Sequence, residues 1–506
     1  MTVIYEINTL VWLGELSGRY GRRVTLGEVP GEVWDEVARP GIDTVWLMGV
    51  WERSPAGLAI ALADEGLLAS FRAALPDLTP ADIAGSPYCV RNYVVDAGLG
   101  GPEGLAAARA ELAARGLRLI LDYVPNHVAP DHPWLTERPD CLVRGTPDDL
   151  ARDPGAFLAA GGQVYARGRD PYFPPWPDVV QLNAFSERLR TATVDTLVSI
   201  GDQADGVRCD MAMLLMNDVF AKTWGDLAGA APAADFWPHV VPRVRERHPG
   251  LLFVAEAYWD LEWALQQQGF DHCYDKRLYD RLVHQDAGSV RAHLGAGLDY
   301  QRGLVRFLEN HDEPRAAATL PGDKERAAAV AVATLPGATL WHEGQFEGRR
   351  VRPPVFLSRR PEEPADESLR DFYGRLVAAV APVREGDWQQ LAATGWPDND
   401  THLDLLAWSW TAGRERYLVV VNYSGRPAQG RVPLPWADLA GQPCELTDLL
   451  AGNTFERDGG ELASPGLFVD LGAWHWHLLA VGRPAAGTGQ SSDGSPAGSG
   501  RLASEA

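Results

Sequence analysis

The sequence of 506 residues predicts an α/β fold: a (β/α)8 TIM barrel with a small lobe inserted after strand 3 and a C-terminal antiparallel β-sandwich domain. Three observations predict this fold. Short apolar runs alternate with helical patterns up to about residue 350, a long aperiodic stretch interrupts them, and closely spaced β-rich runs follow. Continuous apolar runs are typical of parallel strands that are buried on both faces.

Eight apolar runs are the predicted strands of the barrel. They begin at Tyr5, Thr44, Leu117, Gly206, Leu251, Asp271, Leu304 and Gly337, and the second extends to Trp51. Helical patterns separate most of them; the Ala-rich and Leu-rich segment before Leu117, for example, ends at Gly116, a typical helix stop. Eight strands with helical crossovers indicate a closed barrel.

The other segments define the domain boundaries. We expect the barrel to comprise residues 1–127 and 181–385, with the inserted lobe at 128–180, where Pro, Asp, Gly and aromatic residues leave little periodicity. A loop of this length inside a compact domain is usually functional. Short β-rich runs between turn residues predict the β-sandwich at 388–481, and the polar composition of 482–506 predicts a disordered tail.

Composition argues against several classes of partner. The chain has 46 Lys and Arg against 68 Asp and Glu, a net charge of −22, which disfavours nucleic acid. Five widely spaced cysteines without a CxxC motif predict neither a disulfide framework nor a structural zinc site. No apolar run reaches the roughly 18 residues of a membrane span, and the first residues lack a secretion signal. We therefore expect a cytoplasmic protein without a membrane partner; composition does not define the oligomeric state.

Polar side chains cluster where the predicted strands end. They are Asp122 and His127 after the third strand, Arg208 and Asp210 after the fourth, Glu256 after the fifth, and His311 and Asp312 after the seventh. The carboxyl ends of barrel strands form one catalytic face, so these groups are expected to converge. Taken singly, each carboxylate is also typical of a turn or helix cap, and Arg208 with Asp210 of a structural ion pair. Their order after successive strands favours a shared site, in which the arginine would keep the aspartate ionised.

Four short motifs carry a resemblance to a known family. DYVPNH, GVRCD, AEAYW and ENHDE, in this order, resemble the signatures of the α-amylase family of glycoside hydrolases, glycoside hydrolase family 13. VVQLN, residues 179–183, is similar to a weaker fifth signature, and GSPYCVRNY, from Gly85, resembles the segment with the sugar-stacking tyrosine. The resemblance covers roughly residues 1–480.

The resemblance implies a retaining glycoside hydrolase or transglycosidase that acts on α-glucosidic bonds of small or soluble glucans through a covalent β-glycosyl-aspartate. It implies Asp210 as nucleophile, Glu256 as general acid/base and Asp312 as transition-state stabiliser. The implied substrate-binding residues are Tyr88, Asp122, His127, Arg208, His311 and Arg315. For Arg315, a loop ion pair is the alternative.

Two departures from the family pattern narrow these expectations. Met211 and Ala212 follow the nucleophile where typical α-amylases have Lys-His, which disfavours an endo-acting, starch-type site. Gln181 stands where calcium-binding relatives have an aspartate, so we expect no cofactor, and calcium is not favoured. Hydrolysis, transfer and isomerisation share the first half-reaction, and all three stay open. The alternative from another class is a non-catalytic, amylase-like scaffold that binds sugar or protein.

Overall fold

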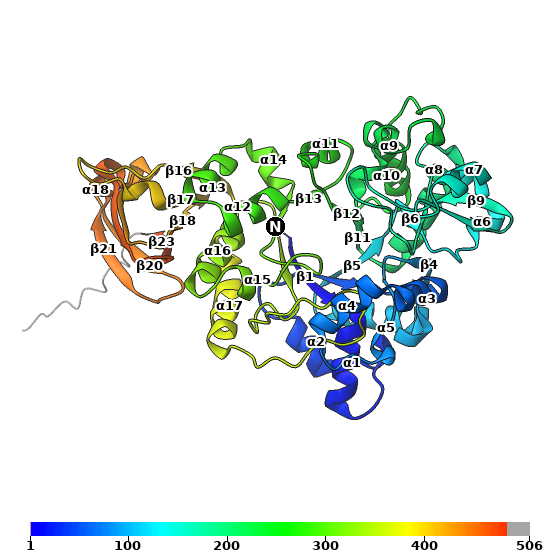
Figure 1. The fold of residues 1–506 in the computed structure, drawn as a ribbon. Helices are drawn as coiled ribbons and strands as arrows, with labels where there is room; N and C mark the ends of the chain where they lie inside the picture. Colours follow the sequence, from blue (N-terminus) through cyan, green and yellow to red (C-terminus); the bar gives the residue numbers. More distant parts are fainter. Residues whose placement is uncertain (1, 483–506) are drawn as a thin grey trace, which may run out of the picture.

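The computed structural model describes residues 2–482 (Figure 1). A barrel occupies the middle of the molecule, the inserted lobe lies at one end and the C-terminal domain at the other. Apart from Gly482, the predicted tail lies outside the described residues.

The eight predicted strands form the closed barrel, which confirms the predicted architecture. Neighbouring strands pair in parallel in the order β1-β15-β14-β13-β12-β11-β5-β2. Every residue of β2 and β15 is buried, as expected for strands covered on both faces. The strands are β1 (Val3–Asn8), β2 (Thr44–Met48), β5 (Arg118–Tyr123), β11 (Gly206–Cys209), β12 (Leu252–Ala255), β13 (His272–Tyr274), β14 (Leu304–Arg306) and β15 (Ala338–His342).

Helices connect successive strands around the outside of the barrel (Figure 1). The helix predicted before Leu117 is α5, and Gly116 follows its end with a φ of +74°, the left-handed conformation that glycine adopts easily. The principal helices are α1 (Thr9–Tyr20), α2 (Gly31–Val37), α5 (Gly101–Ala114), α8 (Glu187–Gln203), α9 (Asn217–Trp224), α10 (Phe236–Arg247), α11 (Glu262–Gln267), α12 (Lys276–His284), α13 (Ala287–Leu294), α14 (Leu298–Arg302), α16 (Asp323–Thr334) and α17 (Glu367–Val380).

The prediction of one strand from Thr44 to Trp51 is wrong. The chain turns at Gly49, where φ is +78° and an added Cβ would lie 2.7 Å from Pro87. Beyond this turn, β3 (Trp51–Arg53) leaves the barrel and pairs antiparallel with β4 (Val90–Val95). Helices α3 (Pro55–Ala63) and α4 (Glu65–Ala74) lie between these two strands in the sequence. The Tyr88 segment directly precedes β4, so this hairpin positions it.

The inserted lobe begins and ends on a pair of short antiparallel strands. In β6 (His127–Val128) and β10 (Val180–Gln181), His127 is the partner of Gln181. This pairing brings the ends of the lobe together beside the barrel. The lobe also contains α6 (Trp134–Glu137), α7 (Pro147–Arg152) and a three-stranded sheet of β7 (Arg144–Gly145), β9 (Gln163–Ala166) and β8 (Phe157–Ala160).

The C-terminal domain consists of two antiparallel sheets that enclose a second apolar core, which confirms the predicted sandwich. Leu418 from the larger sheet and Val432 and Val469 from the smaller one belong to this core. The larger sheet contains β16 (Asp387–Leu391), β17 (Leu405–Ala412), β18 (Glu415–Asn422), β23 (Trp476–Gly482), β20 (Pro443–Asp448) and β21 (Thr454–Asp458); the smaller contains β19 (Ala428–Val432) and β22 (Leu467–Leu471).

The structure also bears on the cysteines and on membrane-spanning helices. All five cysteines lie within the described residues, and each is buried. Among residues 2–482, no helix combines the length and the apolar character needed to cross a membrane.

Candidate active site

The structure brings the three carboxylates of the predicted site into one cavity of about 380 Å³. Asp210 follows β11, Glu256 follows β12, and Asp312 lies in the loop after β14, so the cavity opens at the carboxyl ends of the strands. This is the mouth at which barrel enzymes hold their catalytic groups. The lobe and neighbouring loops complete the lining with Ser86, Tyr88, His127, Trp176, Asp178, Val179, Met211, Tyr258 and Phe356.

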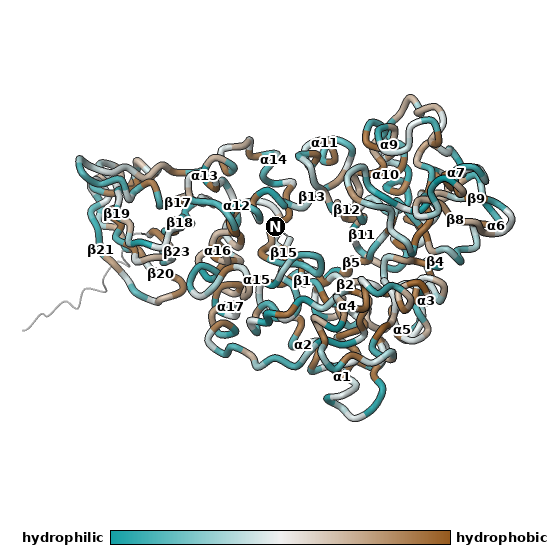
Figure 2. Tube along the Cα trace, viewed as in Figure 1, coloured by the Kyte–Doolittle hydropathy of each residue, from teal (hydrophilic) through white to brown (hydrophobic). Residues whose placement is uncertain are grey.

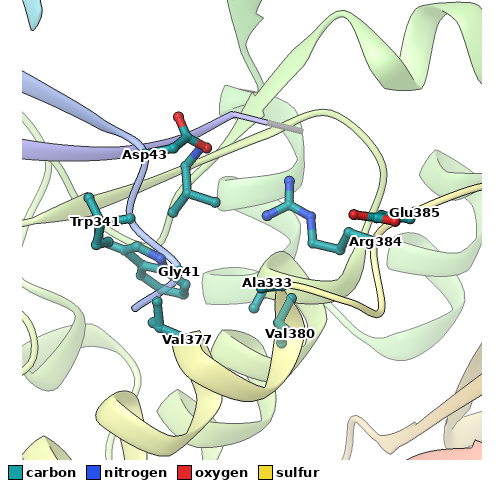
Figure 3. Close-up of a pocket in the computed structure, with 11 residues that line it drawn as sticks. Gly41, Asp43, Ala333, Trp341, Val377, Val380, Arg384 and Glu385 are labelled. Atoms are coloured by element: carbon teal, nitrogen blue, oxygen red, sulfur yellow. The ribbon is translucent and has the colours of Figure 1, made fainter. Parts of the chain in front are cut away.

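A second cavity, of about 240 Å³, lies between the start of β1, the segment before β2 and helix α17 (Figure 3). Two of its charged groups are engaged with the barrel: Asp43 accepts a hydrogen bond from the N–H of Val3, and Arg384 donates to Thr339 at 2.9 Å. This cavity lies at the amino ends of the strands, so we assign the candidate site to the opposite mouth.

Arg208 holds two of the three carboxylates side by side. Its Nη1 donates to Oδ1 of Asp210 at 2.7 Å, and its Nη2 donates to Oε2 of Glu256 at 2.8 Å. The guanidinium is 1% exposed and also lies 5.2 Å from the ring centre of Trp46. Charge-assisted hydrogen bonds in a buried site are strong and directional, so Arg208 fixes the relative position of the two carboxylates.

Asp210 and Glu256 differ in the interactions that set their pKa values. Burial raises the pKa of Glu256 to about 7, and Arg208 only partly offsets it. Burial also raises the pKa of Asp210, but there both the charge of Arg208 and its hydrogen bond act in the opposite direction. Glu256 can therefore retain a proton near neutral pH, as a general acid must.

Two groups that sequence reasoning missed also contact Glu256. The Tyr258 hydroxyl donates to Oε1 at 2.7 Å, and the Met211 N–H donates to Oε2 at 2.7 Å. Met211 has a φ of +42°, a conformation that is uncommon outside glycine, directly after Asp210. The sequence signal for Tyr258 was its position two residues after Glu256 in AEAYW. Both carboxylate oxygens of Glu256 are thus fixed before a substrate binds.

His311 connects the third carboxylate to the barrel core. Its Nε2 lies 2.9 Å from Oδ2 of Asp312 and 2.8 Å from the Tyr88 hydroxyl, and its Nδ1 lies 2.5 Å from Oε1 of Glu6. Burial opposes a charge on His311, but Asp312 and Glu6 raise its pKa well above the usual value. The side chain of Asp312 is 42% exposed, and the charge and hydrogen bond of His311 lower its pKa to about 2. Both groups of this pair are therefore ionised at neutral pH.

Of the predicted substrate-binding residues, Tyr88 and His127 line the cavity. The ring of Tyr88 stacks on that of His311, with centres 5.4 Å apart. Burial lowers the pKa of His127 to about 4, so this imidazole is neutral and can either donate or accept a hydrogen bond. Arg208 and His311 lie behind the lining and contact its carboxylates.

Asp122 is placed differently from the expectation. It is not among the residues that line the cavity, because its Oδ2 accepts hydrogen bonds from Trp46 Nε1 at 3.2 Å and Gly49 N at 3.0 Å. Its Oδ1 lies 3.6 Å from Arg208 Nη1. The structure therefore places Asp122 behind Arg208 as a third carboxylate around the guanidinium, and not against a substrate.

Arg315 forms the loop ion pair that was the alternative to a sugar contact. Its Nη1 donates to Glu309 Oε1 at 2.5 Å and to the Glu343 carbonyl at 2.9 Å, and the side chain is buried. It borders a small space of about 10 Å³ beside His311 and is not among the residues that line the cavity of the three carboxylates. The predicted sugar contact is therefore not supported.

The segment that would hold calcium in relatives offers this chain no carboxylate at the key position. Gln181 Nε2 donates to the carbonyl oxygen and to Oδ1 of Asn126, each at 2.9 Å. It also donates to the Leu182 carbonyl at 3.0 Å. These are the oxygens that a hard cation would need, and the amide already occupies them. The donor set does not fit calcium, and within residues 2–482 no group of three or more His, Cys, Asp or Glu could hold a metal ion.

Comparisons with known proteins agree with this architecture. No family model matches the sequence. The chain is 26% identical over 335 residues to the α-amylase MalA of Haloarcula japonica, which is 63% of this chain and 44% of that protein. It is 21% identical over 298 residues to α-amylase 3 of Dictyoglomus thermophilum, 54% of this chain and 56% of that protein. The matches thus span about half the length of these curated relatives.

Solved structures share the fold over nearly the whole chain. A maltogenic α-amylase from Thermotoga neapolitana superimposes with a TM-score of 0.67 at 18% identity, covering 95% of this chain and 98% of that one. A trehalose-6-phosphate hydrolase from Bacillus licheniformis gives a TM-score of 0.65 at 14% identity, covering 95% and 99%. The four signature motifs in family order, the matches to two α-amylases and this common architecture together make the chain similar to proteins of the α-amylase family.

Proposed function

We propose that the protein is a retaining glycosidase or transglycosidase that acts on α-glucosidic bonds of small or soluble glucans. The observation that carries the proposal is the bridge from Arg208 to Asp210 and Glu256 in the wall of one cavity. Two carboxylates held close together, one ionised and one protonated, are what a double-displacement reaction at a sugar requires.

The geometry supports a role for each carboxylate. Asp210 attacks the anomeric carbon while Glu256 gives its proton to the departing glycosidic oxygen, and a β-glycosyl ester forms on Asp210. Glu256 then takes a proton from water or from a sugar hydroxyl, which attacks the same carbon, breaks the ester and restores the α configuration. Asp312, paired with His311, accepts hydrogen bonds from ring hydroxyls, and these strengthen as the ring flattens in the transition state.

The proposal also includes the cellular compartment. We place the enzyme in the cytoplasm with a soluble glucan as its partner. The buried free thiols of Cys89, Cys141, Cys209 and Cys273 support a reducing compartment, because disulfides persist mainly in oxidising ones.

The test uses α-glucosyl fluoride with and without a sugar acceptor, followed by NMR of the first-formed anomer. We expect α products from the wild type and a loss of at least about 10³-fold in turnover for Asp210→Asn, with folding retained. Asp148→Asn, in the exposed first turn of α7, is the matched control. First-formed β products would exclude retention. Absence of both turnover and covalent labelling at Asp210 would favour the non-catalytic scaffold.

A further inference from the structure

A cavity of about 380 Å³ lies on the outer side of the barrel, apart from the catalytic cavity. Its lining comes from strand β1, helices α1 and α2, the loop after β15 and the start of α17. These three helices lie on one side of the barrel (Figure 2), and the two cavities have different lining residues. We call this space the arginine cavity, after the five arginines in its lining: Arg19, Arg39, Arg349, Arg360 and Arg370.

Two of the five arginines bind three of the four glutamates in the lining. Arg19 donates two hydrogen bonds to the carboxylate of Glu36, at 3.0 Å and 3.2 Å. The buried Arg360 donates to Oε1 of Glu15 at 2.6 Å and also to Glu343. These three carboxylates already have cationic partners within the protein, so they do not make the cavity a site for a cation.

Arg39 and Arg349 are not matched in this way. Nε of Arg39 donates to the carbonyl oxygen of Glu36 at 2.9 Å, and within residues 2–482 no carboxylate lies within 4.0 Å of its guanidinium. Arg349 lies 3.7 Å from Glu15, whose carboxylate is already hydrogen-bonded. Nε of Arg349 is buried, and no described residue accepts a hydrogen bond from it. Both side chains therefore retain donors that a ligand can use.

Two aromatic side chains add further donors to the arginine cavity. Tyr5 is 6% exposed, and no described residue shares a hydrogen bond with its hydroxyl. Burial raises the pKa of Tyr5, and the charges of Glu347 and Arg39 also act on it, which places the hydroxyl beside the charged groups of the cavity. Trp12 lines the same cavity, and its indole N–H has no acceptor among residues 2–482. A buried polar group without a partner costs free energy, so these donors point to a ligand.

The charge of the lining selects an anion. Five arginines face four glutamates, in a chain whose net charge is −22. The fourth glutamate, Glu347, lies 3.6 Å from Arg370. The groups left without partners are thus donors, and two of them are guanidinium groups. Guanidinium groups bind carboxylate and phosphate oxygens in pairs of hydrogen bonds. A phosphate monoester has three acceptor oxygens and close to two negative charges, so it satisfies more of these donors than a carboxylate does.

We propose that the arginine cavity binds the phosphate group of a small organic phosphate, at a site separate from the catalytic cavity. Arg39 and Arg349 neutralise the phosphate, and the Tyr5 hydroxyl donates to one of its oxygens. The volume of about 380 Å³ leaves room for an organic group beside the phosphate, against the rings of Tyr5 and Trp12. This site does not depend on the reaction proposed for the catalytic cavity.

The test is isothermal titration calorimetry with glucose 6-phosphate and with inorganic phosphate, at fixed ionic strength in a buffer without other phosphate. We expect glucose 6-phosphate to bind the wild type more tightly than inorganic phosphate does. Arg39→Gln and Arg349→Gln should each raise its dissociation constant at least fivefold. Arg22→Gln, an exposed arginine outside the lining, removes the same charge and is the matched control. Thermal unfolding checks that each variant is folded, and Tyr5→Phe, a milder change, should weaken binding about twofold or more.

Four outcomes would overturn the inference. They are absence of binding by either phosphate, equal binding by the wild type and both arginine variants, tighter binding of inorganic phosphate than of glucose 6-phosphate, and equally tight binding of the dicarboxylate succinate. Asp210→Asn should bind glucose 6-phosphate as the wild type does, and a loss there would place the ligand in the catalytic cavity instead. Failure of the proposed function appears in a different measurement, as absence of turnover with α-glucosyl fluoride.

Discussion

Oε1 of Glu6 lies 2.5 Å from Nδ1 of His311, and both side chains are buried. Glu6 comes from the first barrel strand, whereas His311 lies after the seventh, next to Asp312. Only the closure of the barrel brings them together, since β15 is the common neighbour of β1 and β14. The result is a chain of charges, Glu6 to His311 to Asp312, that ends at the cavity.

We predict that Glu6→Gln weakens catalysis without touching the substrate. The neutral amide no longer stabilises the imidazolium, so the pKa of His311 falls and Asp312 loses part of its charged partner. We expect kcat to fall at least about tenfold, equivalent to about 1.4 kcal/mol. NMR titration of the imidazole should show a protonated ring through pH 8 in the wild type and a lower pKa in the variant. Glu103→Gln, at an exposed position in the first turn of α5, is the control; an unshifted pKa of His311 would refute the role of Glu6.

The pH dependence of activity should follow Glu256. Its pKa is about 7, so the acid form is lost as pH rises and kcat/KM declines above that value. On the acidic limb, activity falls when Asp210 takes up a proton. Because burial raises the pKa of Asp210, this loss occurs at a higher pH than for an ordinary aspartate. The pH profile of an activated α-glucoside checks both limbs. A flat profile between pH 6 and pH 9 would contradict the assignment of Glu256.

Tyr258→Phe provides a matched test of this limb. The hydroxyl donates to Glu256 and so favours the ionised carboxylate. Its removal should raise the pKa of Glu256 and move the alkaline limb to higher pH. Tyr20→Phe on α1 should leave the limb in place, and a shift of the Tyr258 variant to lower pH would exclude this explanation.

Replacement of Arg208 should impair both stability and turnover. Arg208→Met leaves Asp210, Glu256 and Asp122 buried without their shared cation, and loss of one partner of a buried ion pair costs about 3–5 kcal/mol. Urea unfolding at pH 8, where the carboxylates ionise, should show a loss of that order. Arg208→Lys should recover part of the stability but not turnover, because one ammonium cannot bridge two carboxylates. Arg188→Met removes an exposed ion pair and should change stability by less than about 1 kcal/mol.

Stability should not depend on calcium. The Gln181 amide makes the contacts to Asn126 that a cation would otherwise make. We expect EDTA to leave Tm and activity unchanged, and Gln181→Leu to cost about 1–3 kcal/mol because it strands buried carbonyl oxygens. Asn183→Ala, in the same segment, is the comparison variant. If EDTA lowered Tm and added calcium restored it, the Gln181 amide would not be the replacement for a calcium ion.

Much of the site was predictable because, in a parallel barrel, the catalytic residues directly follow the apolar runs that form the strands. Each strand is an apolar run, so the polar residue that ends it is conspicuous, as with Asp210 after GVRCD and Glu256 after LLFVAEAYW. Glu6 was not identified because it lies inside the apolar run of the first strand, where a single charged residue carries no sign of a functional role. The β3–β4 hairpin was missed because Gly49 interrupts the run Thr44–Trp51 through its backbone conformation, which the apolar pattern does not reveal.

The sequence by itself determined the barrel, the C-terminal sandwich and the identities of the three carboxylates, since local periodicity and strand-end position are written along the chain. Only the tertiary structure decided how the charges are shared: Arg208 bridges two carboxylates, Asp122 stands behind it, and Arg315 is bound to Glu309. The physical reason is that burial and partner choice depend on contacts between residues far apart in the sequence. Those contacts set pKa values and the direction in which each side chain points.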